Sequence, residues 1–112
     1  MYNKIVSPGV DHLLSENRQE MERLCKKYAV RRLKLFGSAT GSEFNDNKSD
    51  LDFLVEFGPP PIGMRPGVQF FEFVDKLEEI LKRPVDLLEE SAIENSHLRR
   101  SVMASAVTVY AA

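Results

Sequence analysis

Apolar residues recur at steps of three and four positions in two stretches of the chain, with charged residues between them. The first stretch runs from Val10 to Tyr28 and the second from Val68 to Arg83. This spacing places the apolar side chains on one face of a helix, so both stretches are predicted to be amphipathic helices. Pro84 follows the second stretch and is expected to end that helix.

Two segments between these helices are typical of half-buried strands. Val30–Phe36 alternates apolar with charged residues and stops at Gly37-Ser38, a pair that favours a turn. Asp50–Phe57 is rich in aromatic and branched residues and is followed by a Gly-Pro-Pro-Pro sequence. Residues 58–67 contain too much proline and glycine for a helix or a central strand, and we expect an exposed loop there.

The last quarter of the chain predicts a strand, a helix and a second strand. Val85–Leu88 is a short apolar run, and a helix is expected to begin near Ser91, because Glu94 three residues later completes a capping box. Ala106–Tyr110 should be a strand or an extended tail. The order helix, strand, strand, helix, strand, helix, strand predicts an α/β (α+β) fold, a small sheet covered by helices in two layers.

Composition then narrows the class of protein. The chain has 112 residues, of which 43% are apolar and 29% charged, so we expect one folded domain over residues 1–112. Fifteen basic residues face seventeen acidic ones, for a net charge of −2. This balance gives no overall positive field and argues against nucleic acid as the partner.

Cys25 is the only cysteine, which excludes an intramolecular disulfide and a cysteine-based zinc site. Such cysteine usage fits a reducing cytoplasm. The chain also has no apolar run of signal-peptide or membrane-spanning length, and we therefore expect a cytoplasmic protein without membrane contact.

Candidate chemistry begins at Asp50 and Asp52. One residue separates them, so a strand would place both carboxylates on one face and Leu51, Phe53, Val55 and Phe57 on the other. Two such anions repel each other unless a divalent cation lies between them, and oxygen ligands suit Mg²⁺ or Mn²⁺. The alternative is a pair of solvated aspartates beside a turn.

Two further features are weak when taken singly. Gly37-Ser38 ends a strand, where a glycine allows the backbone to approach an anion and adjacent N–H groups can bind phosphate, although an ordinary turn has the same composition. Asp86 lies inside an apolar strand, either on its solvent face or directed at the same site as Asp50 and Asp52.

In combination and in this order, these segments resemble the minimal nucleotidyltransferases of the DNA polymerase beta superfamily. The resemblance is carried by Leu35-Phe36-Gly37-Ser38, by residues 48–57 with their Asp-Leu-Asp core, and by residues 83–88 around Asp86. The segment 95–101 and Val109-Tyr110 are similar to the family's final helix and terminal strand.

The resemblance implies the polymerase-beta-like nucleotidyltransferase fold and a role for each motif. Gly37 and Ser38 would hold the triphosphate of a nucleotide, Asp50 and Asp52 would bind two Mg²⁺ ions, and Asp86 would complete the metal site and help to activate the attacking hydroxyl. These three aspartates would therefore be both the metal ligands and the catalytic residues, with ATP as the substrate.

The activity implied by the resemblance is transfer of a nucleoside monophosphate, AMP from ATP, to a hydroxyl acceptor. In the family the acceptor is commonly a tyrosine of a small helical partner of the HEPN type, with which the nucleotidyltransferase forms a toxin–antitoxin pair. The alternative is an antitoxin without catalysis that neutralises its partner by binding. Nucleotide transfer to a small aminoglycoside-like alcohol would need a substrate-binding domain for which the chain has no room.

Overall fold

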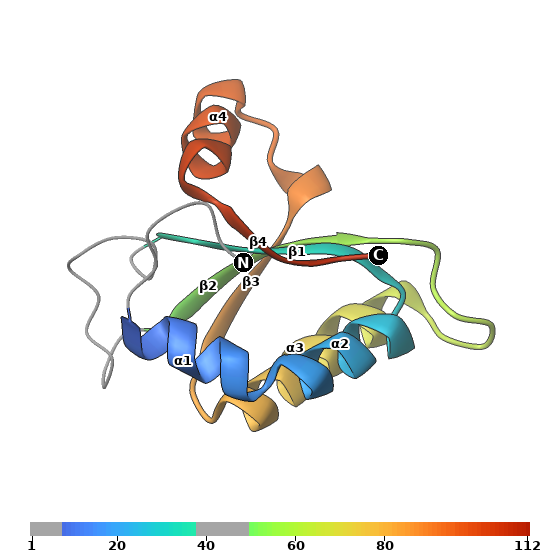
Figure 1. Cartoon of the computed structure of the whole chain (residues 1–112). Helices are drawn as coiled ribbons and strands as arrows, with labels where there is room; N and C mark the ends of the chain where they lie inside the picture. Colours follow the sequence, from blue (N-terminus) through green and yellow to red (C-terminus); the bar gives the residue numbers. More distant parts are fainter. Residues whose placement is uncertain (1–7, 38–49) are drawn as a thin grey trace.

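Four strands in residues 8–37 and 50–112, the part of the chain that the computed structural model describes, form one mixed sheet with helices on both of its faces (Figure 1). In chain order the elements are α1 (Pro8–Glu16), α2 (Arg18–Lys27), β1 (Val30–Phe36), β2 (Leu51–Phe57), α3 (Pro66–Leu81), β3 (Val85–Glu89), the 3₁₀ turn η2 (Glu90–Ala92), α4 (Ser96–Ser105) and β4 (Val107–Ala111).

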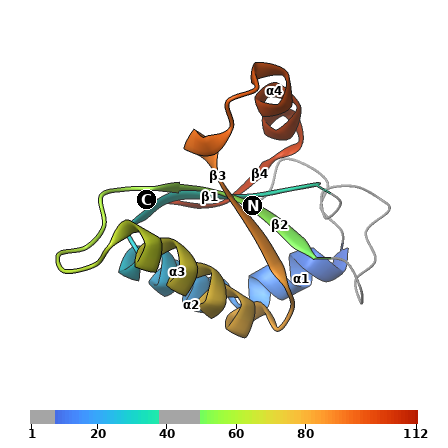
Figure 2. The same ribbon diagram turned by 180° about the vertical axis from the view of Figure 1, so that it is seen from behind.

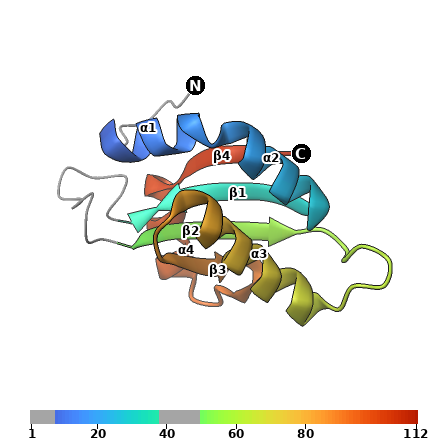
Figure 3. The ribbon, with the colours of Figure 1, turned by 90° about the horizontal axis from the view of Figure 1, so that it is seen from below.

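The sheet has the strand order β3-β2-β1-β4. Strand β1 runs antiparallel to both β2 and β4, whereas β2 and β3 are parallel, with α3 as the connection between them. Helices α1, α2 and α3 lie across one face, and α4 stands on the other (Figures 2 and 3). The predicted fold class is confirmed, and α4 adds a small packing layer beyond the two that were expected.

The main core fills the space between the sheet and α1, α2 and α3. Alternate residues of β1 and β2 enter it because side chains in a strand point to opposite faces in turn. Phe73 of α3 lies at its centre, with its ring edge-on to Tyr28 at 6.1 Å and to Phe57 at 5.7 Å between ring centroids. The fully or almost fully buried members from the strands are Val30, Leu33, Leu35, Leu51, Phe53 and Val55.

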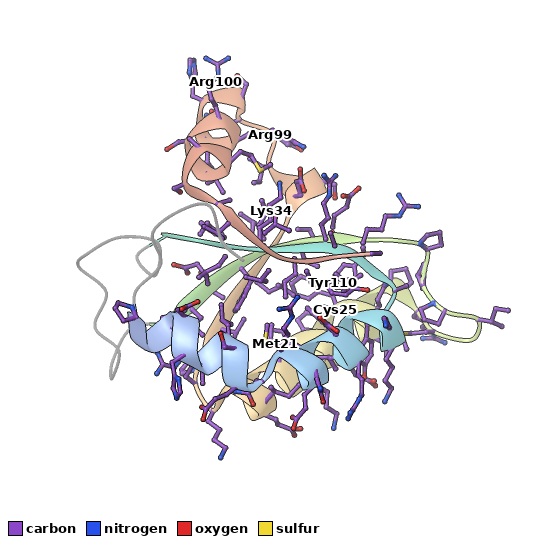
Figure 4. The ribbon with its side chains drawn as sticks, viewed as in Figure 1. Met21, Cys25, Lys34, Arg99, Arg100 and Tyr110 are labelled. Carbon is purple, nitrogen blue, oxygen red and sulfur yellow. The ribbon has the colours of Figure 1, made fainter. Side chains whose placement is uncertain are left out.

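Cys25 belongs to this core and has no access to solvent. Figure 4 shows it between α2 and the sheet, near Met21 and Tyr110. Burial, with a smaller contribution from the charge of Glu22, raises the pKa of the Cys25 thiol to about 12. The thiolate is therefore not formed near neutral pH, and Cys25 acts as an apolar filler.

The first predicted helix, Val10–Tyr28, is divided in two at Asn17. The Asn17 side chain donates a 2.9 Å hydrogen bond from Nδ2 to the carbonyl oxygen of Leu13. A side-chain bond to the carbonyl four residues earlier competes with the helical ladder and bends the chain. The apolar spacing could not reveal this break, because the buried residues of α1 and α2 remain in helical phase across it.

Helix α3 begins and ends earlier than predicted. Pro66 occupies its first turn, where its fixed φ suits a helix and the missing N–H costs nothing, so the exposed loop ends before residue 67. At the other end Lys82 adopts a left-handed conformation (φ 57°) and its N–H donates to the Glu78 carbonyl oxygen at 2.8 Å. Pro84 disfavours helical geometry at Arg83, and the chain has already left the helix there.

The predicted helix start near Ser91 is wrong. Residues 90–92 form the single turn η2, and α4 begins at Ser96 with Asn95 as its N-cap. The Asn95 side-chain oxygen accepts from the N–H groups of His97 and Leu98 at 2.9 and 3.0 Å, so the true cap is satisfied locally. Buried Ile93 keeps this stretch extended, because its side chain packs on the sheet under α4.

A second, smaller cluster lies between α4 and the sheet. It contains Leu54, Ile93 and Val102, with Phe36, Leu88 and Met103 packed around them. None of the helices in the described ranges combines the length and apolar character needed to cross a bilayer.

Gln69 is the one polar residue among the buried side chains of the described chain, at 3% exposure. Its Nε2 donates to the Tyr28 carbonyl oxygen at 2.8 Å and to the Gly58 carbonyl oxygen at 3.2 Å. These bonds fix α3 to the end of α2, where the Tyr28 carbonyl is buried, and to the half-buried Gly58 that follows β2.

Gln69→Leu is expected to destabilise the protein by roughly 1–3 kcal/mol, because the substitution leaves the buried Tyr28 carbonyl oxygen without its side-chain donor. Urea denaturation followed by circular dichroism measures this loss. Gln19→Leu is the matched control, since Gln19 lies on the exposed side of α2 and should change stability by no more than about 0.5 kcal/mol. Equal effects of the two substitutions would contradict the role of Gln69.

Candidate active site

The face of the sheet that carries α4 also carries Asp52. Leu51, Phe53 and Val55 point into the main core, so the residues between them point to the opposite face. Leu54 confirms this direction, because it packs under α4 with Val102. The sequence prediction that Asp52 lies on the face opposite Leu51, Phe53 and Val55 is therefore confirmed.

Asp86 lies beside Asp52 in the neighbouring strand. The parallel pairing of β2 and β3 aligns Asp52 with Asp86, and neighbouring strands are about 4.8 Å apart. Val85 and Leu87 contact the main core whereas Leu88 packs under α4, so Asp86 shares the α4 face with Asp52. Asp86 is exposed on the edge strand β3 and is also aligned with Asp52, so the two positions considered for it coincide, and its role at the site stays a prediction.

Asp50 was predicted to lie within the strand, but β2 begins at Leu51, so Asp50 precedes it and is exposed. Its charge nevertheless reaches Asp52. Burial, then the charge of Asp86 and then that of Asp50 raise the pKa of the half-buried Asp52 carboxyl above its usual range. Asp86 and Asp50 thus both disfavour the charged form of Asp52, and a cation placed beside Asp52 would offset that repulsion.

Gly37 lies directly against Asp52 at the end of β1. It has a φ of +76°, a backbone conformation that favours glycine. A Cβ at this position would overlap Asp52 Oδ2 and lie 3.1 Å from Asp52 Cγ. Gly37 therefore allows both the turn and the close approach of the carboxylate, and Ser38, the other residue of the predicted phosphate-binding pair, lies outside the described residues.

The donor set fits a hard divalent cation in kind. Mg²⁺ prefers oxygen ligands and is commonly held by one or two carboxylates together with the phosphates of a substrate. In residues 8–37 and 50–112, no three His, Cys, Asp or Glu side chains are close enough to enclose an ion by themselves. Aspartates that hold Mg²⁺ in such a partial shell would share the ion with the phosphates of a ligand.

The same face carries charged residues that the sequence analysis did not single out. Arg32 and Glu56 form an ion pair at 2.7 Å across β1 and β2, and this pair lowers the pKa of Glu56. Lys34, two residues from Phe36 on the same face of β1, lies under α4, with Nζ 3.9 Å from Met103 Sδ (Figure 4). Alternate residues of a strand share a face, so Lys34 and Phe36 of β1 lie on the same side. The pairing of Phe36 with Asp52, which only the structure shows, places that side with Asp52.

Comparison with known proteins gives a consistent result. A profile of the family described as the nucleotidyltransferase domain matches residues 18–109. The chain is 36% identical over 85 residues to a Methanocaldococcus jannaschii protein whose name infers it to be a protein adenylyltransferase, and the match covers 76% of this chain and 82% of that protein.

Solved structures show the same fold. A chain described as an inferred minimal nucleotidyltransferase superposes with a TM-score of 0.69 at 28% identity, over 85% of this chain and 91% of that one. A chain from the complex of a tri-AMPylated Shewanella oneidensis HEPN toxin with its MNT antitoxin superposes with a TM-score of 0.58 at 19% identity, over 88% and 72% of the two chains. At 19% identity this second likeness concerns the fold alone.

Gly37→Ala is expected to destabilise the protein by about 1–2 kcal/mol from backbone strain and to displace the Asp52 carboxylate in addition. Gly63→Ala is the matched control, because Gly63 also has a positive φ (+86°) but a Cβ added there would have no neighbouring heavy atom within 4 Å. Both variants should lose stability in urea denaturation, and only Gly37→Ala should weaken Mg²⁺ binding. Equal Mg²⁺ affinity in the two variants would contradict the contact with Asp52.

Asp52→Asn should raise thermal stability in EDTA, because it removes the repulsion between the opposed carboxylates of Asp52 and Asp86. Such a like-charge pair destabilises a sheet by roughly 0.2–1 kcal/mol. For a domain of this size the melting temperature should rise by roughly 1–5 °C. Added Mg²⁺ should then stabilise the unchanged protein more than the variant. A variant that melts lower in EDTA, with the same response to Mg²⁺, would contradict repulsion at this position.

Proposed function

The chain belongs to the nucleotidyltransferase domain family, and from that premise we propose that it transfers AMP from ATP to a hydroxyl group of a protein. Nucleotidyl transfer follows from family membership. The choice of AMP and of a protein acceptor is supported by the inferred protein adenylyltransferase from Methanocaldococcus jannaschii. The observation that carries the proposal is the meeting of Asp52, Asp86 and Gly37 at one end of the sheet.

Asp50 and Asp52 are proposed to hold the metal-bound nucleotide, with Asp86 completing the set. When bound, Mg²⁺ ions, two in number by analogy with the family, would neutralise charge on the phosphates and lower the pKa of the attacking hydroxyl. The alignment of Asp52 with Asp86 in neighbouring strands supports this assignment, because carboxylate oxygens are ligands that Mg²⁺ prefers. Gly37 and Ser38 are proposed to receive the triphosphate, since a glycine at φ +76° exposes backbone to an anion.

The transfer step is an in-line displacement at the α-phosphorus. The acceptor oxygen forms a bond to the α-phosphorus while the bond from that atom to the oxygen bridging to the β-phosphate breaks, and pyrophosphate leaves. Exposed Asp86 is proposed to take the proton of the acceptor hydroxyl and to pass it to water. The neighbouring Asp52 is proposed to hold the metal-bound nucleotide during this step. The protein thus positions the reactants and stabilises charge, and it undergoes no covalent change.

The acceptor is proposed to be a tyrosine of a HEPN-type partner, which would make this protein an antitoxin that acts by modification. Support comes from the fold shared with the chain of the Shewanella oneidensis complex, in which the HEPN toxin is AMPylated. The α4 face is open to such a partner at Asp86, whereas α1, α2 and α3 cover the other face of the sheet (Figure 1).

Isothermal titration of ATP, GTP and CTP with Mg²⁺, and again with EDTA, tests the nucleotide site. ATP should bind only with Mg²⁺, and Asp50→Ala should weaken that binding at least tenfold. Asp86→Asn should retain ATP binding but slow the transfer of label from α-labelled ATP to a tyrosine acceptor by roughly 10²–10⁴-fold, as expected on loss of a general base.

Asp75→Ala is the matched control, because Asp75 is an exposed aspartate on α3, across the sheet from the site. It should leave both binding and transfer unchanged. Failure of all three triphosphates to bind the unchanged protein would overturn the proposed activity and favour an antitoxin that acts by binding alone.

A further inference from the structure

Helix α4 is held to the rest of the molecule by few buried side chains. Of its ten residues, only Val102 is buried, and Met103 is half-buried beside it. Isolated helices of this length are marginally stable in water, so a helix of a globular protein normally relies on packing of a whole face. Most of the surface of α4 is instead exposed to solvent.

The position of α4 relates it to the candidate active site. Leu54 and Leu88 pack beneath α4, and their neighbours two positions earlier on the same face are Asp52 and Asp86. A protein hydroxyl that reaches these carboxylates must approach from this face, because the other face is covered by three helices (Figure 2). The acceptor protein therefore arrives next to α4.

The charge of α4 is of one sign. Within Ser96–Ser105 there are two arginines and a histidine but no aspartate or glutamate. Arg99 is partly neutralised by Glu90, with 3.4 Å between Arg99 Nη2 and Glu90 Oε1. Arg100 is exposed and has no carboxylate within ion-pair distance in the described part of the chain, and its side chain points away from the sheet (Figure 4).

An apolar side chain accompanies this cation. Leu98 lies one helical turn before buried Val102, on the side of α4 that continues the apolar stripe toward the N-terminal end of the helix. It is 53% exposed, one of few large hydrophobic side chains so exposed in the described residues. Burial of a leucine stabilises a complex by roughly 1.5–3 kcal/mol, so Leu98 is suited to contact a protein surface.

We propose that α4 is the docking helix for the acceptor protein, and that it recognises an acidic surface through Arg100 with an apolar contact at Leu98. The proposal rests on the proposed function, because it concerns how the acceptor of that reaction is chosen. Acidic residues of the acceptor would be repelled by Asp50, Asp52 and Asp86 and attracted by α4, so the two charge patches together fix its orientation.

RNA is the competing ligand for a cationic helix, and the charges on this face disfavour it. A phosphate backbone would have to lie along a surface that carries three carboxylates as well as the cations of α4. An acidic protein patch can be small enough to contact α4 alone.

The test uses the whole chain and two tyrosine-containing copolymers as probes, poly(Glu,Tyr) and poly(Lys,Tyr), labelled with fluorescein. Fluorescence anisotropy without ATP measures docking, and transfer from α-labelled ATP with Mg²⁺ measures modification. Poly(Glu,Tyr) should bind and be modified in preference to poly(Lys,Tyr). Arg100→Glu should weaken poly(Glu,Tyr) binding at least fivefold and raise its KM while leaving ATP affinity unchanged.

Lys26→Glu is the matched control, an equal charge reversal at an exposed residue of α2 on the opposite face. It should leave both measurements unchanged. Leu98→Ser should also weaken poly(Glu,Tyr) binding about threefold, and Ile62→Ser, at a fully exposed residue of the β2–α3 loop, should not.

The proposal is overturned if Arg100→Glu binds poly(Glu,Tyr) as Lys26→Glu does, or if oligo(A) RNA binds more tightly than poly(Glu,Tyr) and loses that affinity in Arg100→Glu. Failure of the proposed function has a different signature, since ATP would not bind to any variant while the anisotropy measurement would still report whether α4 docks an acidic chain.

Discussion

The alternation of side chains along β2 is the constraint on which the rest of the structure depends. Leu51, Phe53 and Val55 are completely buried against the helices, and a shift of the strand by one residue would expose all three. Their burial holds Asp52 on the opposite face, where its carboxylate lies against Gly37. The favourable free energy of burying these three apolar side chains thus fixes the position of the Asp52 carboxylate, a group that would be costly to bury.

The acidic side chains gather on the face of the sheet opposite the main core. The parallel pairing of β2 with β3 brings Asp86 beside Asp52, and the turn at Gly37 brings backbone against the same carboxylate. The pKa of Asp52 is raised first by its burial and then by the charges of Asp86 and Asp50. The protein tolerates the repulsion because the main core lies on the other face, so the stability of the fold does not rest on the carboxylates.

The two faces of the sheet therefore have different tasks. On one face, α1, α2 and α3 pack on the sheet to form the main core. Gln69 of α3 donates hydrogen bonds to the residues that end α2 and follow β2. On the other, α4 covers only a small cluster and leaves the carboxylate end of the sheet accessible. Helix α4 contributes few buried side chains to the fold. Its Arg100 and Leu98 are therefore exposed and can contact a partner.

The sequence by itself determined the elements that rest on local patterning. The strands β1 and β2, the amphipathic helix α3 and the fold class follow from periods of two and of about 3.6 residues, and the spacing of Asp50 and Asp52 was enough to predict a metal site, which stays a prediction. Family membership, carried by the same motifs, is confirmed. These features depend on residues that are close together in the chain.

Tertiary structure decided what depends on distant residues. The alignment of Asp86 with Asp52 comes from the register of two strands that α3 joins, and the side of the sheet taken by α4 comes from the packing of Val102 on Leu54. The break at Asn17 and the true cap at Asn95 arise from side-chain hydrogen bonds that compete with helix formation. Hydrophobic periodicity carries no information about such competition, because it records which side chains are buried and not which polar group a backbone atom binds.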